Sequence, residues 1–202
     1  MMKPDSIFSG WLILAAVAAV LLGGAAWFVI TSAEQSRADI DIYGNVPDFE
    51  FRAHTGEKFG SENLKGSISV IDIIFTSCRA ACPIMTPNMA ALYRAFEESD
   101  IVRFVSISCD PEVDTLPVLQ EYARTYGVAD GRWKFLRTDI ENVVELSEKG
   151  FMLSASGLPM GHSTKFILVD ENLQIRGYYD GLSSDSIDIL KEHIAILAKK
   201  PQ

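Results

Sequence analysis

A nearly continuous run of β-branched residues, ISVIDIIF from Ile68 to Phe75, predicts a β-strand that is buried on both faces. Such a strand lies inside a sheet that helices cover on both sides. The rest of the chain alternates between strand-like and helix-like periodicity. Further strands are expected at 102–107, 133–136, 164–169 and 174–179, an edge hairpin near Phe49 and Phe51, and helices at 83–96, 116–126, 140–149 and 187–197.

This order of elements predicts the fold class. Strand-helix-strand units require right-handed crossovers and a parallel core, whereas the closing hairpin adds an antiparallel edge. We therefore predict an α/β fold, a thioredoxin-like three-layer sandwich with a central mixed sheet. In open sheets of this kind, functional residues gather at the carboxyl ends of the strands. All three cysteines, Cys78, Cys82 and Cys109, follow predicted strand ends.

The N-terminal part contains a segment without any charged residue, from Trp11 to Ile30. A helix of this length, at about 1.5 Å per residue, spans roughly 30 Å, which is the hydrocarbon thickness of a bilayer. Trp11 and Trp27 lie near its ends, where aromatic residues gather at membrane interfaces. We expect one N-terminal transmembrane helix. A signal peptide cleaved after Thr31-Ser32-Ala33 is the alternative, although its apolar region would normally be shorter.

The predicted organisation has four parts. They are a cytoplasmic N-terminus (1–10), a transmembrane anchor (11–30), a stalk (31–45) and a thioredoxin-like domain (46–202). Lys3 and the terminal amine favour the cytoplasmic side for the N-terminus, so the domain is expected on the extracytoplasmic side, in a periplasm or an intermembrane space. A net charge of −9 disfavours nucleic acid as a partner.

Two of the cysteines, Cys78 and Cys82, lie four residues apart between the buried strand and a helix that begins near Pro83. A helix N-terminus stabilises thiolate, which is both the nucleophilic and the metal-binding form of cysteine. The segment therefore supports disulfide chemistry and soft-metal binding about equally. Two inert thiols or a structural disulfide are less favoured. Because Cys82 extends the apolar stripe of the helix, we expect Cys78 to be the more accessible thiol.

A metal site would need a third ligand, and the chain has three histidines. His54 falls in a predicted surface turn, and His193 lies at the margin of the apolar stripe of the last helix. His162 lies in LPMGHST, directly before the strand at 164–169, and in a thioredoxin-like sheet this loop faces the cysteine loop. On spacing alone, a capping or hydrogen-bonded loop role for His162 is favoured over a ligand role.

Three segments taken together resemble the SCO/SenC family of copper-binding cytochrome c oxidase assembly proteins. They are FTSCRAACP in the cysteine loop, SCDPEVDT after the second strand and GHST before the later strand. The resemblance covers roughly 46–197 together with the N-terminal anchor. It implies that copper is held by both loop cysteines and the later histidine, which carries over to Cys78, Cys82 and His162. Two soft thiolates and one imidazole suit Cu(I) and also tolerate Cu(II).

The chain departs from the family pattern at several positions. Arg79-Ala80-Ala81 replaces a Pro-Asp-hydrophobic triplet. The cation at Arg79 either lowers the pKa of nearby thiols or is simply exposed to solvent. Gly161 replaces an aspartate before the histidine, which puts the orientation of His162 in doubt. Cys109 replaces an aliphatic residue; it is explained as a small buried side chain, with a third thiol near the site as the alternative. Asp114 or Thr115 is expected to cap the following helix.

The resemblance implies a membrane-anchored copper metallochaperone that assists assembly of the copper centre of a respiratory cytochrome c oxidase. Its partners would be an oxidase subunit with a copper site, and a thiol reductant or another copper chaperone. Two alternatives remain open. One is a thiol-disulfide oxidoreductase with Cys78 and Cys82 as its redox-active pair, and the other is a redox or copper sensor. Against the oxidoreductase, Pro159 stands too far before Thr164 to match the cis-proline of many thioredoxin-like reductases.

Overall fold

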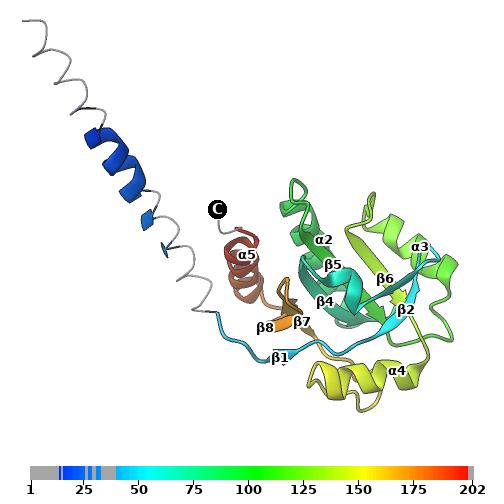
Figure 1. The fold of residues 1–202 in the computed structure, drawn as a ribbon. Coiled ribbons are helices and arrows are strands. Elements are labelled where there is room, and N and C mark those ends of the chain that lie inside the picture. Colours follow the sequence, from blue (N-terminus) through cyan, green and yellow to red (C-terminus); the bar gives the residue numbers. More distant parts are fainter. Residues whose placement is uncertain (1–13, 15, 26, 29–30, 33–39, 200–202) are drawn as a thin grey trace, which may run out of the picture. The chain divides into compact units, whose positions relative to one another are not determined.

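The computed structural model describes residues 14, 16–25, 27–28, 31–32 and 40–199 (Figure 1). The chain divides into two units, and the folded domain comprises Ile40–Ala198. Among the described residues, no helix has the length and apolar character needed to cross a bilayer. The predicted cytoplasmic N-terminus at 1–10 lies outside the described residues. So do parts of the predicted anchor and stalk, namely 11–13, 15, 26, 29–30 and 33–39.

The domain is built around one eight-stranded mixed sheet with the order β1-β8-β7-β4-β5-β6-β2-β3. The strands are β1 (Gly44–Asn45), β2 (Glu50–Ala53), β3 (Lys58–Gly60), β4 (Ile68–Ile74), β5 (Val102–Ser108), β6 (Trp133–Arg137), β7 (Lys165–Val169) and β8 (Gln174–Asp180). Strands β4, β5 and β6 are parallel, and β7 and β8 add antiparallel pairs on the other side of β4. The predicted parallel core with a closing hairpin is therefore confirmed.

Helices cover both faces of this sheet and complete three layers (Figure 1). The helices are α2 (Cys82–Ala95), α3 (Leu116–Thr125), α4 (Ile140–Glu145) and α5 (Ser184–Ala198), with a short 3₁₀ turn at Ser61–Leu64. Apolar side chains of α2, α3 and α5 pack on one face, and those of α4 pack on the other. Every residue of β4 is buried, because this strand lies between the two apolar layers.

The local sequence explains most element boundaries. Pro83 occupies the first turn of α2, where its missing N–H costs no hydrogen bond. The predicted helix at 140–149 is shorter than expected, because α4 ends at Glu145 and a wider π-type turn, Leu146–Gly150, follows. A Cβ on Gly150 would press against Pro47 and Leu146, so this close approach requires glycine.

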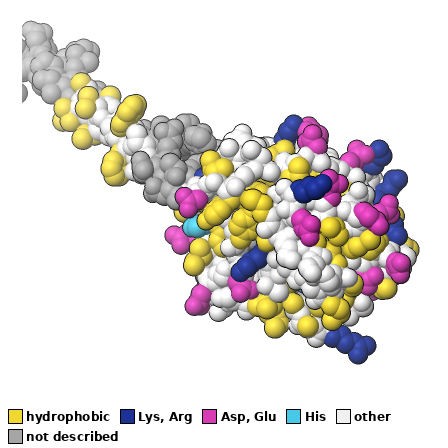
Figure 2. Space-filling model, turned by 90° about the horizontal axis from the view of Figure 1, so that it is seen from below, with side chains coloured by type: hydrophobic (Ala, Val, Ile, Leu, Met, Phe, Trp, Pro, Cys, Tyr) yellow, Lys and Arg dark blue, Asp and Glu magenta, His cyan; other side chains and the backbone are white. Residues whose placement is uncertain are grey.

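The surface carries both signs of charge (Figure 2). On the face drawn there, Lys and Arg side chains lie apart from one another among acidic side chains. Several exposed basic residues pair with a carboxylate close by, such as Lys58 with Glu50 and Arg124 with Glu121. Exposed pairs of this kind contribute little to stability.

Candidate metal centre

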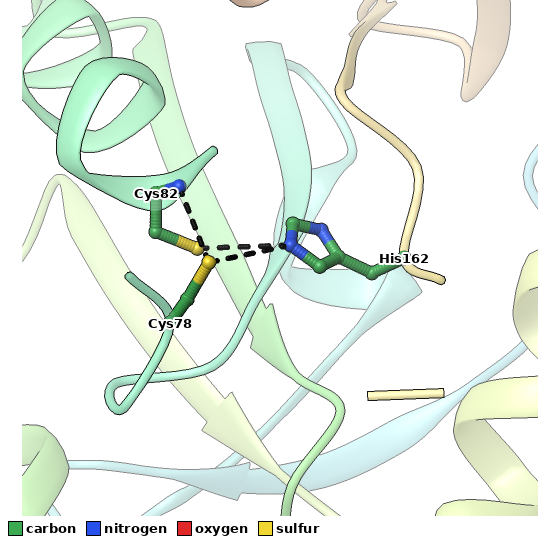
Figure 3. Close-up of side chains that lie close together, drawn as sticks. All are labelled: Cys78, Cys82 and His162. Atoms are coloured by element: carbon green, nitrogen blue, oxygen red, sulfur yellow. Dashed lines mark hydrogen bonds between the residues drawn. The ribbon is translucent and has the colours of Figure 1, made fainter. Parts of the chain in front are cut away.

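The structure brings Cys78, Cys82 and His162 together at the end of the sheet where β4 finishes and β7 begins (Figure 3). The Nε2 atom of His162 lies 3.9 Å from Cys78 Sγ and 3.8 Å from Cys82 Sγ. The three candidate ligand atoms all lie within 4.8 Å of one another. In the part of the chain that the structure describes, this is the one cluster of three or more His, Cys, Asp or Glu side chains arranged in this way.

The cysteine loop is shaped by the end of β4 and the start of α2. The backbone N–H of Cys78 donates to the carbonyl of Phe75, which turns the chain directly after the strand. The backbone N–H of Cys82 then points at Cys78 Sγ, at 3.5 Å. A sulfur atom that accepts a hydrogen bond at a helix N-terminus is stabilised as thiolate.

His162 is oriented by its own loop. Its backbone N–H donates to the carbonyl of Pro159, and its Nδ1 lies 3.1 Å from the carbonyl oxygen of Ser163. Because a carbonyl oxygen only accepts, Nδ1 carries the hydrogen and Nε2 keeps a lone pair directed at the two sulfur atoms. The ring also packs edge-on against Phe75, with 5.4 Å between ring centroids.

Gly161 is explained by this loop. A Cβ at position 161 would collide with the carbonyl oxygen of Ser156. The absence of an aspartate here, which left the orientation of His162 in doubt, is therefore offset by a loop that orients the ring through the Ser163 carbonyl. The Leu158–Pro159 peptide bond in the same loop is cis, a feature that the sequence argument did not assign to Pro159.

The two thiols differ in accessibility and in acidity. Cys78 is partly exposed, whereas Cys82 is 2% exposed. Burial raises the pKa of Cys78, but the N–H of Cys82, the His162 side chain and the N–H of Ala80 outweigh this effect and bring it to about 6. Burial raises the pKa of Cys82, and the nearby Cys78 and Asp72 raise it further. The groups that favour the Cys78 thiolate are thus mainly backbone amides and a histidine. Arg79 is exposed, which was the second of the two alternatives for this residue.

Cys109 lies outside this cluster. It is 1% exposed at the end of β5, and burial is the largest cause that raises the pKa of its thiol to about 12. Its Sγ lies 3.9 Å from the carbonyl oxygen of Pro159, the same oxygen that accepts from the N–H of His162. The expectation of a small buried residue fits this position, and its contact with the histidine loop could not be predicted from the sequence.

Two predictions about other residues need correction. His54 is not a surface residue: it is 7% exposed, and its Nδ1 accepts a hydrogen bond from the N–H of Phe135 at 3.2 Å. Asp114 does not cap α3. Its buried carboxylate accepts hydrogen bonds from the N–H and the hydroxyl of Thr76 and from the hydroxyl of Ser108. Thr115 stands at the N-cap position, but its side chain makes no capping hydrogen bond.

His193 lies at the margin of the apolar face of α5, as predicted. Its Nδ1 is 2.6 Å from the hydroxyl oxygen of Tyr179 in β8. This contact joins the helix to the sheet, so the structure gives His193 a packing role and keeps it out of the cluster of Cys78, Cys82 and His162.

Sequence reasoning also missed Asp72, a carboxylate in the middle of β4. It is 1% exposed, and burial raises its pKa to about 7, although the neighbouring Ser106 hydroxyl acts in the opposite direction. The signal was present in the sequence, because Asp72 is the one charged residue in the apolar run ISVIDIIF.

The donor set determines which metals fit. Two thiolates and one imidazole form a soft site that suits Cu(I) and tolerates Cu(II). A structural zinc site would normally have four protein ligands, and three converge here. The lone pair of His162 Nε2 already faces both sulfur atoms, so a copper ion could be held without reorienting the ring.

Comparison with known proteins agrees with this geometry. Residues 39–198 match the family model for SCO1/SenC. The SCO1 protein homolog of Bacillus subtilis is 31% identical over 149 residues, which cover 71% of this chain and 77% of that protein. A SCO2-like protein of Rickettsia felis is 33% identical over 119 residues, 54% of this chain and 58% of that protein.

Solved structures show the same architecture. A SCO1/SenC family lipoprotein from Bacillus anthracis superposes with a TM-score of 0.71 at 30% identity, over 77% of this chain and 96% of that one. BsSco, a member of the Sco family of cytochrome c oxidase assembly proteins in which a disulfide switch was identified, gives a TM-score of 0.68 at 29% identity, over 79% and 98%. Yeast Sco1 with copper bound gives 0.59 at 22% identity over 75% and 89%, a likeness of fold.

Proposed function

This chain belongs to the SCO1/SenC family, and on that premise we propose that it is a copper metallochaperone for the assembly of a cytochrome c oxidase copper centre. Copper would be its cargo, held by Cys78, Cys82 and His162. The observation that carries the proposal is the convergence of two thiols on one imidazole nitrogen, at 3.9 and 3.8 Å. The copper-bound structures of yeast Sco1 and of Bradyrhizobium japonicum ScoI, which share this fold, support copper as the cargo.

The chemistry of the ligands suits a transfer protein. Cys78 already favours thiolate near neutral pH, and Cys82 must lose its proton when a metal binds. Three protein ligands leave a coordination position that an acceptor thiolate or imidazole can occupy. Because Cys78 is partly exposed and Cys82 is buried, we expect an acceptor to displace Cys78 first.

The test is copper binding by the full chain, purified in detergent and kept reduced. We expect about one Cu(I) or Cu(II) per chain, with a thiolate-to-Cu(II) absorption band in the oxidised metal state. Cys78→Ser, Cys82→Ser and His162→Ala each remove a ligand. Each should lower the affinity by at least about 10–100-fold, which is the loss that follows from altering only an outer-shell partner of a ligand. Cys109→Ser and His193→Gln are matched controls that should bind as the unaltered chain does. Binding that is unchanged in all three ligand variants would remove the proposal.

A second function, thiol-disulfide exchange, is favoured by the asymmetry of the two thiols. The Cys78 thiolate would attack a substrate disulfide and form a mixed disulfide, which Cys82 would resolve by releasing the reduced substrate and closing the Cys78–Cys82 disulfide. Dithiothreitol would return the pair to the reduced form. Reduction of a disulfide-bonded peptide from an oxidase subunit measures this activity. We expect Cys78→Ser to abolish it, Cys82→Ser to stop at the mixed disulfide and Cys109→Ser to retain it. No turnover by the unaltered chain would contradict this function.

A redox or copper sensor would use the same three residues but would not deliver copper. An assay of copper transfer to an acceptor peptide therefore distinguishes a sensor from a metallochaperone. A metallochaperone should pass its copper to a peptide that carries an oxidase copper-site sequence. A sensor should retain its copper in this assay.

We also propose that the domain is anchored by the apolar segment at 11–30 and faces the extracytoplasmic side. The uncharged length of that segment supports this placement. There it would meet an oxidase subunit, and a thiol reductant or another copper chaperone. Membrane fractionation with protease access from the extracytoplasmic side tests the placement. Recovery of the full chain in the soluble fraction would contradict it.

A further inference from the structure

Phe75 joins the two halves of the candidate metal centre. It directly follows β4, and its carbonyl oxygen accepts a hydrogen bond from the backbone N–H of Cys78 at 3.2 Å. Its ring meets the ring of His162 with 5.4 Å between the centroids and an angle of 87° between the ring planes. The backbone of Phe75 thus shapes the cysteine loop, while its side chain contacts the imidazole.

The ring of Phe75 forms a fixed surface. The residue is 4% exposed and belongs to the apolar layer on the α4 side of the sheet, together with Cys109. Cys78 packs against the same layer. Because protein interiors are packed as densely as organic crystals, a ring embedded in such a layer has little room to shift. His162, in contrast, is only partly buried and extends from a loop.

Two contacts orient the His162 ring, and their effects differ. The hydrogen bond from Nδ1 reaches the carbonyl oxygen of Ser163, which is the next residue of the same loop. This bond decides which nitrogen carries the hydrogen, but its acceptor moves wherever the loop moves. Phe75 belongs to a different segment, the one that leads into the cysteine loop, so its ring orients the imidazole relative to the two sulfur atoms. Edge-to-face aromatic pairs are attractive beyond the area that they bury.

We propose that Phe75 is a positioning residue whose ring holds His162 Nε2 toward the two cysteine sulfur atoms, and that it thereby enables the site to retain Cu(II) as well as Cu(I). Thiolates are soft ligands that favour Cu(I), whereas an imidazole suits Cu(II) as well. Cys78 and Cys82 can therefore hold Cu(I) even when the imidazole is displaced. Cu(II) depends more strongly on the third ligand, so it is the ion whose retention depends on Phe75.

The copper part of this inference rests on the proposed function, whereas the orientation of the ring needs no metal. Both can be measured in the full chain with Phe75→Leu and Phe75→Met, which keep the backbone carbonyl that holds Cys78 but remove the aromatic ring. Phe75→Tyr keeps the ring and is the conservative variant. Circular dichroism and thermal unfolding verify that each variant folds, and either non-aromatic variant suffices for the test.

Phe151→Leu is the matched control. Phe151 is 0% exposed and lies in the same apolar layer as Phe75, so the same substitution removes a comparable amount of packing. It follows the π-type turn at Leu146–Gly150, however, and does not lead into the cysteine loop. An effect that appears in Phe75→Leu and not in Phe151→Leu therefore belongs to the contact with His162.

The first measurement is nuclear magnetic resonance of the reduced, metal-free chain in detergent, with isotope-labelled histidine at pH 8. The chain has three histidines, and His162→Ala identifies the signals of His162. We expect one narrow set of His162 ring signals, with the hydrogen on Nδ1, in the unaltered chain, in Phe75→Tyr and in Phe151→Leu. These signals should broaden or split in Phe75→Leu and Phe75→Met, because the ring then samples several orientations.

The second measurement is the affinity for Cu(II) and for Cu(I), each determined by competition with chelators. Phe75→Leu should lower the Cu(II) affinity by about tenfold, the lower end of the range for residues that contact a ligand and not the metal. The Cu(I) affinity should change much less, because two thiolates satisfy a soft ion. Electron paramagnetic resonance of the Cu(II) form should show weaker coupling to an imidazole nitrogen in Phe75→Leu, and Phe75→Tyr should resemble the unaltered chain.

The two measurements separate the inference from the proposed function. Broadened His162 signals in the non-aromatic variants, with no copper binding by the unaltered chain, would support Phe75 as a positioning residue and reject the copper function. Copper binding with the His162 signals and the ratio of Cu(II) to Cu(I) affinity unchanged in the Phe75 variants would overturn the inference and leave the copper function standing. Equal effects in Phe151→Leu would also overturn it, because lost packing and not the aromatic contact would then be the cause.

Discussion

At the scale of single residues, the site depends on the contrast between Cys78 and Cys82. One thiol is partly exposed and receives two backbone N–H groups, while the other is buried beside a carboxylate. The spacing of the two cysteines could be read from the sequence, and so could the buried position of Cys82. The acidity of Cys78 could not, because it depends on a histidine eighty-four residues away and on amides that only the folded loop directs at the sulfur.

This contrast predicts a pH-dependent reactivity. In the reduced, metal-free chain, alkylation of Cys78 by iodoacetamide should increase as pH rises through about 6, because the thiolate reacts and the thiol does not. Cys82 and Cys109 should stay unreactive up to pH 8, since both are buried and their pKa values are raised. Peptide mass spectrometry after timed labelling measures all three rates.

The control for this experiment is His162→Ala. His162 helps to lower the pKa of Cys78, so its removal should move the midpoint of alkylation toward higher pH. A midpoint near 9 in the unaltered chain would show that the folded loop leaves Cys78 with ordinary acidity.

A second prediction concerns Gly161. Gly161→Ala places a methyl group against the carbonyl oxygen of Ser156, so the loop that carries His162 must shift. Such overpacking costs about 1–3 kcal/mol, and part of this cost should appear as a loss of copper affinity of about tenfold. Gly131→Ala is the matched control, because its added Cβ would meet only the end of the Lys134 side chain at 3.9 Å. Equal copper affinity in the two variants would contradict this account of the loop.

At the scale of elements, the three ligands are delivered by the ends of neighbouring strands. Strand β4 leads into the cysteine loop, the loop before β7 carries His162, and β4 pairs with β7 directly. Strand β5 pairs with β4 on the side opposite β7, and it is followed by the turn that contains Asp114. This carboxylate ties the start of the cysteine loop to the end of β5 through Thr76 and Ser108.

Asp114→Asn should therefore destabilise the domain. An amide accepts through one oxygen only, and its NH₂ group would face donors that now point at a carboxylate. Because Asp114 is fully buried, we expect a loss of about 2 kcal/mol in the free energy of unfolding, measured by urea denaturation of the reduced chain. Asp188→Asn, on the exposed side of α5, should change it by less than about 0.5 kcal/mol. A loss equally small in Asp114→Asn would show that these hydrogen bonds are energetically neutral.

At the scale of the whole molecule, hydrophobic periodicity was enough to predict the class and layering of the domain. The runs that form β4, β5 and β6 alternate with helices, and β7 and β8 close the sheet as a hairpin. The rule of right-handed crossovers leaves only a handful of arrangements for such units. The sequence did not predict the short edge strand β1, because a two-residue strand has no periodicity. Nor did it predict the buried position of His54, whose neighbours Phe135 and Gln120 are distant in sequence.

The pairing of β4 with β7 has a consequence for folding. Cys78 and Cys82 lie close together as soon as the first turn of α2 forms, but His162 joins them only after the sheet has assembled across eighty residues of chain. An incompletely folded chain offers two thiols and no imidazole, so it binds the metal less well than the native chain does. A ligand that prefers the native state stabilises that state by mass action. Copper would thus act as a check on folding, because only a chain with a finished sheet can retain it against competing thiols.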